Sequence, residues 1–70
     1  MEDVRIRFGK ALRVRRRKLG LSQEEFADLC GLDRTYVSGI KRGERNLALV
    51  NIEKLARAFK ISPSDLFRSV

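Results

Sequence analysis

Residues 21–43, LSQEEFADLCGLDRTYVSGIKRG, decide the fold of this chain. Their apolar residues recur at intervals of three and four, which predicts two short amphipathic helices joined by a turn. Ser22 and Glu25 have the spacing of a capping box at the start of the first helix, and Gly31 ends that helix. Asp33 is a favourable N-cap residue for the second helix. The stretch therefore predicts two helices that meet at a glycine turn.

The second of these helices has an apolar side and a polar side. Val37 and Ile40 are expected to face the core, together with Phe26, Ala27 and Cys30 of the first helix. The residues expected on the opposite side are Thr35, Ser38, Gly39 and Arg42, with Arg34 and Tyr36 at the helix tip. A helix that presents arginine and small polar groups from its first turn fits the major groove of DNA.

Three further helices are expected around this pair. One covers residues 4–19, one covers residues 49–59 with the poor cap residue Ala48 before it, and a short last helix opens at Ser62 and Pro63. The inward residues expected from the first of them are Phe8, Leu12 and Leu19. No alternating run is long enough for a sheet. We therefore predict an all-α, five-helix fold in a single domain, residues 1–70.

The charge of the chain indicates a polyanion as partner. Sixteen Lys and Arg against nine Asp and Glu give a net charge of +7. The excess lies in residues 1–20 and 34–60, on either side of an acidic segment at 21–33. A cationic helix surface in solvent explains the charge equally well. In particular, the run at residues 13–18, RVRRRK, is interpreted as a solvated helix face partly near DNA, in which Arg15 and Lys18 need no functional role.

The content of cysteine and histidine limits the chemistry that the chain can perform. It has one cysteine, Cys30, which is expected in the core, and no histidine. A metal site of ordinary ligand count and a Ser–His or Cys–His pair are both excluded, and capping explains Glu24 and Glu25. We expect no cofactor, no metal and no enzymatic activity. A lone cysteine fits the reducing cytoplasm, and no apolar run is long enough to span a membrane.

Residues 8–67 resemble the phage-repressor and Cro-like helix-turn-helix family. The most specific part is LSQEEFADLCGL at residues 21–32, followed by a helix that closes in Arg42 and Gly43. In that family Ala27 is the small residue where the two helices touch, and Gly31 takes the left-handed turn. The resemblance implies a lambda-repressor-like fold and sequence-specific binding of double-stranded DNA.

A closer similarity is to the small controller proteins of restriction–modification systems. It rests on GLDRTYVSGI at residues 31–40 and on Arg45, Asn46 and Leu47. This resemblance implies a homodimer that binds a pseudo-palindromic operator and regulates its own promoter, with RNA polymerase as a further candidate partner. A phage-type repressor or an antitoxin-like regulator of the same fold is the alternative.

Two positions depart from the family pattern. Family members usually carry Glu where this chain has Lys41, and that Glu pairs with the first-helix arginine that corresponds to Arg16. Because both positions are basic here, either Lys41 turns to solvent or both cations lie near a phosphate. Gly39 stands where repressors often place a base-reading side chain. Base recognition is therefore expected to concentrate at the tip of the helix.

The residues expected to read bases are Arg34, Thr35 and Tyr36. Arg34 has the donors for guanine O6 and N7, whereas a solvated arginine is disfavoured at the positive end of a helix. Thr35 suits a thymine methyl group or a base edge, and otherwise needs no explanation on a surface. Tyr36 either contacts DNA or covers the edge of the core. The residues expected to contact the DNA backbone are Ser22, Gln23, Ser38, Arg42, Arg45 and Asn46.

The last third of the chain has more apolar groups than a small monomer hides easily. We expect a two-fold dimer interface formed by Leu47, Leu49, Phe59, Ile61, Leu66, Phe67 and Val70. Two other classes of protein compete with the DNA-binding interpretation. A cationic membrane-surface protein is disfavoured because the apolar stripes of several helices need each other to form a core. An RNA-binding module is disfavoured because only Tyr36 is a candidate exposed aromatic residue.

Overall fold

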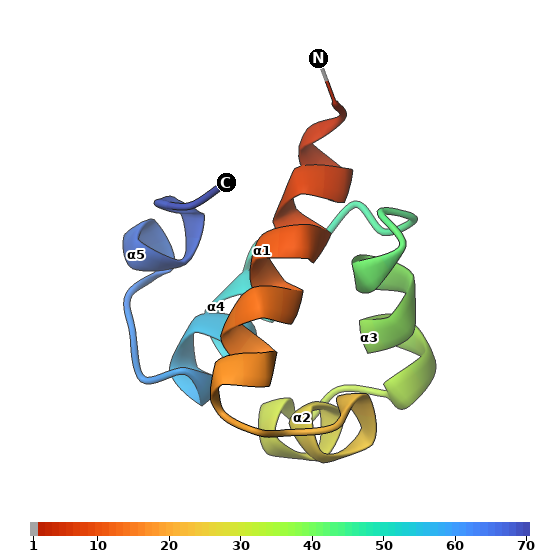
Figure 1. The fold of residues 1–70 in the computed structure, drawn as a ribbon, viewed down its shortest axis with the longest axis vertical. Coiled ribbons are helices and arrows are strands. Elements are labelled where there is room, and N and C mark those ends of the chain that lie inside the picture. The colour runs from red at the N-terminus through yellow and green to blue at the C-terminus, as the bar shows by residue number, and fades with distance from the viewer. Residues whose placement is uncertain (1) are drawn as a thin grey trace.

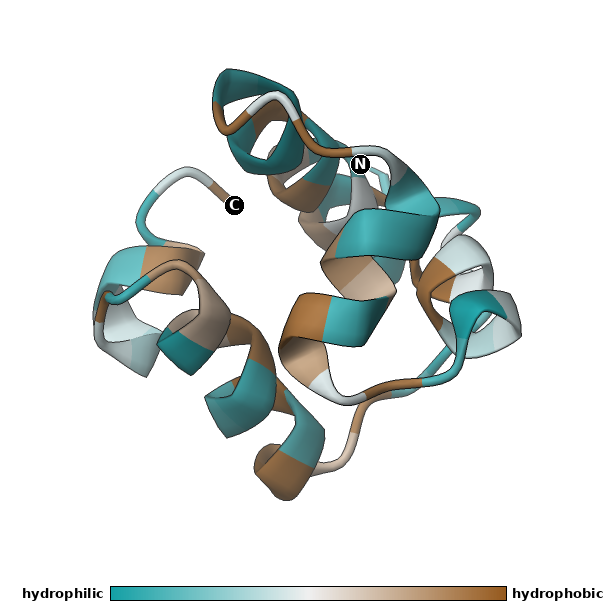
Figure 2. Ribbon diagram, turned by 90° about the horizontal axis from the view of Figure 1, so that it is seen from below, coloured by the Kyte–Doolittle hydropathy of each residue, from teal (hydrophilic) through white to brown (hydrophobic). Residues whose placement is uncertain are grey.

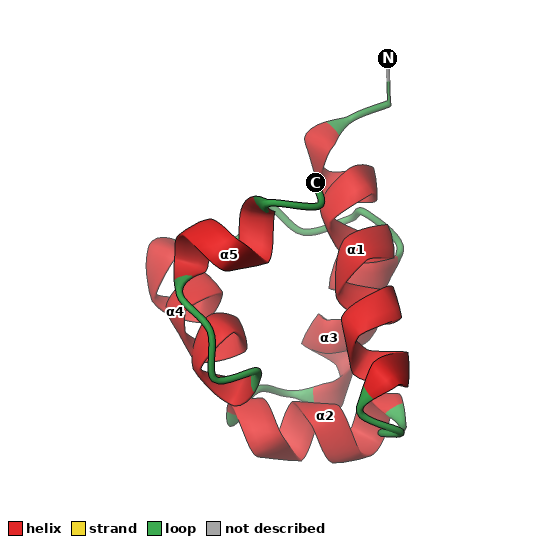
Figure 3. Cartoon of the chain, turned by 60° about the vertical axis from the view of Figure 1, so that its left-hand side comes forward, coloured by secondary structure: helices red, strands yellow, loops and turns green. Residues whose placement is uncertain are grey.

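Five helices make up the computed structural model, which describes residues 2–70. They are α1 Val4–Lys18, α2 Gln23–Cys30, α3 Arg34–Lys41, α4 Leu49–Ala58 and α5 Pro63–Phe67. α1 runs along the longest dimension of the molecule, with α3 on one side and α4 and α5 on the other (Figure 1). The described residues contain no strand (Figure 3). The predicted all-α, five-helix fold is confirmed.

The side chains predicted from the sequence as N-caps cap the starts of α2, α3 and α5. At α2, Ser22 Oγ accepts a hydrogen bond from the Glu25 backbone N–H at 3.1 Å, and Glu25 Oε1 accepts one from the Ser22 N–H at 2.9 Å. At α3, Asp33 Oδ1 accepts from the Thr35 N–H at 2.7 Å. Ser62 caps α5 in the same way. Each cap satisfies backbone donors that a helix leaves unpaired at its start.

Two glycines fix the angles between helices. Gly31 has φ 71°, a left-handed conformation that strains residues with a Cβ atom, and it ends α2 three residues before α3 begins. Gly9 lies where α1 crosses α3, and a Cβ atom there would lie 2.8 Å from the carbonyl oxygen of Lys41. The sequence pointed to the first glycine but not to the second. The close crossing at Gly9 brings α1 against the back of α3.

The core lies between α1, α2, α3 and α4, and α5 closes it. Its buried residues are Phe8, Leu12, Phe26, Ala27, Cys30, Val37, Ile40, Leu55, Ala56 and Leu66. Phe26 is fully buried, and its ring stacks on that of Phe59 at 5.0 Å between centroids. Hydrophobic and hydrophilic segments alternate along the helices, as amphipathic helices require (Figure 2).

Three expectations are corrected by the structure. Leu19 lies on the same stripe as Phe8, but it is the C-cap of α1, past the end of the helix, and it is 51% exposed. Leu66 is 1% exposed and packs inside the protomer, so it offers no surface to a second copy. Gly39 is buried rather than outward, since the side chain of Arg45 covers it.

Candidate nucleic-acid interface

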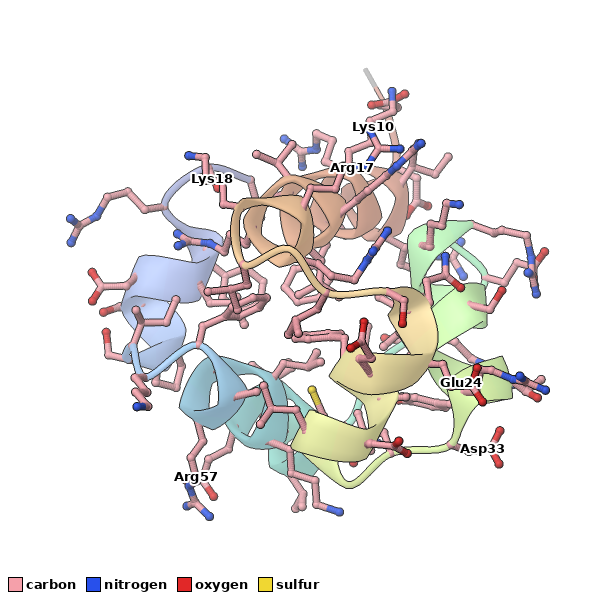
Figure 4. The ribbon with its side chains drawn as sticks, turned by 60° about the horizontal axis from the view of Figure 1, so that its bottom comes forward. Lys10, Arg17, Lys18, Glu24, Asp33 and Arg57 are labelled. Atoms are coloured by element: carbon pink, nitrogen blue, oxygen red, sulfur yellow. The ribbon has the colours of Figure 1, made fainter. Side chains whose placement is uncertain are left out.

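The tip of α3 is exposed while its underside is held in the core. The side chain of Arg34 is 67% exposed, and Nη1 lies 3.4 Å from Oε1 of Glu24 on α2. Figure 4 shows Glu24 and Asp33 on the same side of the molecule, where α2 and α3 meet. Val37 and Ile40 keep only 3% and 1% of their surfaces exposed. The first turn of α3 therefore projects from a firmly packed base.

Asp33 holds the start of α3 in place. Hydrogen bonds from the Thr35 backbone N–H to the carboxylate lower the pKa of Asp33, and the charge of Arg34 adds to the effect. The carboxylate therefore stays ionised at neutral pH, at the positive end of the helix dipole. This cap leaves the side chain of Thr35 exposed beside that of Arg34.

Tyr36 covers the edge of the core between α3 and α4. Its hydroxyl oxygen accepts a hydrogen bond from Nδ2 of Asn51 at 3.0 Å. The guanidinium of Arg45 lies over its ring, 5.1 Å from the ring centroid. Of the two roles left open by the sequence, the structure supports the packing role. The phenolic O–H keeps its own proton for donation to a further acceptor.

Arg42 and Ser38 lie together, as expected of two neighbouring contacts to a DNA backbone, but they already have partners. Arg42 donates to Ser38 Oγ at 2.6 Å and forms two hydrogen bonds with the carboxylate of Glu44, at 3.0 and 3.1 Å. These bonds lower the pKa of Glu44. A phosphate has to compete with Glu44 for this arginine.

A small hollow at the start of α2 gathers three cations. Arg13, Arg16 and Lys41 line it with Gln23, the first residue of α2, and its volume of about 10 Å³ is just enough for one water molecule. The backbone N–H groups of a helix start favour anions at such a place. Arg13 was not among the predicted site residues, because the run at residues 13–18 does not reveal which arginine faces α2.

The ion pair that family members form between positions 16 and 41 is absent here, because both residues are basic. Arg16 donates from Nη1 to the backbone carbonyl of Leu21. Its guanidinium therefore has a hydrogen-bond acceptor although no carboxylate is present. Lys41 is exposed to solvent, which is one of the two outcomes expected for it. Both side chains also line the hollow at the start of α2.

Arg45 and Asn46 follow α3 in an exposed loop. Arg45 passes over α3, and a Cβ atom built on Gly39 would lie 2.8 Å from its Nε atom. Its guanidinium is thereby held against Tyr36, next to the exposed face of α3. The glycine that removes a base-reading side chain thus makes room for this arginine.

Exposed apolar side chains gather at the start of α4 and the end of α5. Leu49 is 83% exposed, Val50 64% and Phe67 41%. A nearby hollow of about 110 Å³ is lined by Val4, Arg5, Phe8, Asn46, Leu47, Ile52 and Phe67. Among the other residues predicted for an interface, Phe59, Ile61 and Val70 are half-buried, and the ring of Phe59 stacks on the core residue Phe26. Val50 and Val4 were not predicted. Across residues 2–70, no helix has the length and apolar character needed to cross a bilayer.

Comparison with known proteins places the fold. The helix-turn-helix family matches residues 12–66. The control protein C.MunI of Mycoplasma sp is 48% identical over 71 residues, covering 100% of this chain and 96% of the relative. The control protein C.BamHI of Bacillus amyloliquefaciens is 46% identical over 65 residues, covering 91% of this chain and 80% of the relative.

Two solved structures of controller proteins are also similar to this chain in fold and in sequence. The restriction-modification controller protein C.AhdI from Aeromonas hydrophila superposes with a TM-score of 0.85 at 56% identity, covering 90% of this chain and 96% of that one. The controller protein C.Esp1396I, solved as a tetramer in complex with its natural 35 base-pair operator, gives 0.83 at 30% identity, covering 96% and 88%. The chain therefore belongs to the helix-turn-helix family and is similar to its restriction–modification controller proteins.

Proposed function

We propose that this protein is a sequence-specific regulator of transcription that binds double-stranded DNA as a homodimer. The observation that carries the proposal is the exposed first turn of α3 on a buried underside. In this arrangement α3 enters the major groove, and Arg34 and Thr35 face the base edges. Tyr36 supports the helix from the side of α4 and keeps a hydroxyl donor for the DNA.

Contacts to the DNA backbone would come from two places beside α3. Gln23 starts α2, where Arg13 and Lys41 line the same hollow. Ser22, the N-cap of α2, is a further candidate beside Gln23. On the other side, Arg45 lies above Tyr36, and Ser38, Arg42 and Asn46 are further candidates. Positive side chains and helix starts bind phosphate oxygens without reading sequence. They would set the position of α3 in the groove.

The apolar surface around Leu49 is the proposed two-fold interface. Leu49, Val50 and Phe67 are exposed, and Leu47 lines the hollow next to Phe67. Burying such a surface against a second copy would stabilise a domain of only 70 residues. The dimer would place its two α3 helices about 34 Å apart, one turn of DNA. One domain would thus carry both DNA binding and dimerisation.

The role of a restriction–modification controller that regulates its own promoter is favoured over other regulators of this fold. The control protein C.MunI matches nearly end to end, whereas the competence pilus inhibition repressor of Acinetobacter baylyi is 30% identical and is covered over only 54% of its length. RNA polymerase is a candidate partner for activation. The protein would act in the cytoplasm, where the DNA is.

The proposal contains no catalytic step and no cofactor. The chain has no histidine, and its one cysteine, Cys30, is the last residue of α2 and is buried in the core. Burial raises the pKa of the Cys30 thiol to about 11, so the thiol stays protonated and is a poor nucleophile at neutral pH.

Fluorescence anisotropy with labelled duplexes tests this function. The DNA upstream of the protein's own gene should bind at least about 10³-fold more tightly than a random duplex at the same salt concentration. Equal affinity for both duplexes would refute sequence-specific regulation. Structured RNA and anionic liposomes are the controls for the two competing classes, and stronger binding to either would replace the proposal.

A further inference from the structure

The side of α1 that faces away from α3 carries its own group of cations. A hollow of about 460 Å³ lies there, between α1 and the C-terminal residues Ser69 and Val70. Its basic lining residues are Arg7, Lys10, Arg15 and Lys18. Figure 1 shows α3 on one side of α1, and α5 with the C-terminus on the other. A duplex docked on α3 would therefore leave this hollow uncovered.

The cations of this hollow are only partly neutralised. Lys10 pairs with Glu2 at 2.7 Å, and Glu2 is the single acidic side chain among the described residues that line the hollow. Arg15 donates from Nη2 to the backbone carbonyl of Asp65 at 2.8 Å, which leaves its charge uncompensated. Four basic groups against one acidic group give the lining an excess of positive charge.

Two buried donors in the lining lack an acceptor. The Nε atoms of Arg7 and Arg15 are buried, and neither has a hydrogen-bond partner within residues 2–70. Buried polar atoms without partners are rare in folded proteins. Because these two Nε atoms are buried, a ligand in the hollow would meet the outer N–H groups of the guanidinium ends, which suit phosphate oxygens.

The remaining walls of the hollow are apolar. Ala11 and Val14 of α1 face it together with Val70. Its volume lies within the range of about 300–1,000 Å³ that is usual for small-molecule sites. An inorganic ion would fill only a small part of this space. The combination of basic groups and apolar walls suits an anion that also has an apolar or aromatic part.

We propose that this hollow binds an organic phosphate of the nucleotide class. The phosphate groups would lie among Arg7, Lys10 and Lys18, and the planar base would pack against Val14 and Val70. The site is separate from the exposed tip of α3, so it does not depend on the proposed function. It gives a role to Lys18, which the sequence alone left without one.

NMR titration of the ¹⁵N-labelled full chain with ADP tests this proposal on a protein of 8.1 kDa. Saturable amide shifts are expected around Arg7, Ala11, Val14 and Val70, with a dissociation constant below about 1 mM. ADP should bind more tightly than inorganic phosphate. Shifts that do not saturate, or affinity no greater than that of inorganic phosphate, would overturn the assignment.

A pair of matched double variants provides the control. Lys10→Gln with Lys18→Gln removes two exposed cations of the hollow and should weaken ADP binding at least about 10-fold. Lys54→Gln with Arg57→Gln removes the same charge from exposed positions of α4 that do not line the hollow, and should leave the affinity unchanged. Equal loss in both double variants would show general attraction to a basic protein, and would contradict a built site.

Discussion

Nη1 of Arg34 lies 3.4 Å from Oε1 of Glu24, so the arginine expected to read bases is paired across two helices. Both side chains remain exposed, at 67% and 68%. A pair this exposed contributes about 0–1 kcal/mol, because water screens it. The pair holds Arg34 near the α2 side of the tip. Because it is weak, Arg34 is able to leave Glu24 and donate its hydrogen bonds to a guanine instead.

Glu24→Gln is expected to tighten DNA binding. Arg34 then has no carboxylate to leave, and a negative charge is removed from the surface that faces phosphates. The dissociation constant for the operator should fall by up to about 5-fold at low salt, and less at high salt. Anisotropy titrations at two salt concentrations measure this change. Glu53→Gln, which removes a charge from α4, is the control, and weaker binding by Glu24→Gln would count against the exchange.

Leu49→Glu is expected to convert the dimer to a monomer. Leu49 is 83% exposed in the protomer, so the change should alter protomer folding by less than about 0.5 kcal/mol. A buried carboxylate at a two-fold interface meets its own copy, which opposes association. Sedimentation velocity measures the assembly. Leu29→Glu on α2, 55% exposed, is the matched control and should stay dimeric. A dimer that survives Leu49→Glu refutes the proposed interface.

Gly9→Ala is expected to destabilise the fold by about 1–3 kcal/mol, because the added Cβ atom would meet the backbone of α3. Thermal unfolding followed by circular dichroism measures the loss. Gly20→Ala provides a comparison, since Gly20 has φ 71° but no atom within 4 Å of the added Cβ. Its cost should be limited to conformational strain of about 1–2 kcal/mol. A Gly9→Ala variant as stable as the original chain would contradict the close crossing of α1 and α3.

Acid should destabilise the protein in a window set by its capping carboxylates. Hydrogen bonds with the side chain and backbone N–H of Arg5 lower the pKa of Asp3 from 3.8 to about 2, and capping also lowers the pKa values of Glu25 and Asp33. Because the folded pKa lies below the unfolded one, this stabilisation is present above the unfolded pKa and is lost as the pH falls through the folded pKa. The melting temperature should therefore drop between about pH 4 and pH 2.

The control for the acid prediction is Asp33→Asn. Asparagine caps a helix about as well as aspartate but does not titrate. The variant should keep α3 at neutral pH and lose less stability than the original chain on acidification. If both chains lose the same stability, Asp33 does not contribute to the acid dependence.

The local features of the fold follow from the sequence. Ser22, Asp33 and Ser62 cap their helices through bonds to residues two or three positions ahead, and Gly31 turns the chain by its own conformation. Such signals lie within a few residues and need no knowledge of the packing. This is why the order of the five helices and most of the core were predicted.

The features that were missed depend on contacts between distant parts of the chain. Gly9 meets Ile40 and Lys41 of α3, and Arg15 donates to the carbonyl of Asp65, fifty positions away. Nothing in the residues near Leu66 distinguishes a core leucine from an exposed one. Its burial follows from how α5 closes over α1 and α4, and that arrangement is not encoded in local spacing.

Only those parts of the candidate site that depend on local spacing were predicted from the sequence. The exposure of Arg34 and Thr35 follows from the period of α3, because Val37 and Ile40 define the opposite face. The role of Tyr36 depends on Asn51 of α4, which the sequence does not place beside it. The pairing of Arg42 with Glu44, and of Arg34 with Glu24, likewise arises only when the loop and the helices are positioned.

The most direct test of base reading by the tip of α3 is a footprint of the chain and of Arg34→Ala on the DNA upstream of its gene. The chain should protect two inverted half-sites about one helical turn apart. Arg34→Ala should lose about 1–3 kcal/mol of operator binding and accept other bases at one position of each half-site, with unchanged affinity for random duplex. Absence of protected half-sites at every protein concentration, or an equal loss of affinity for operator and random duplex, would contradict the account.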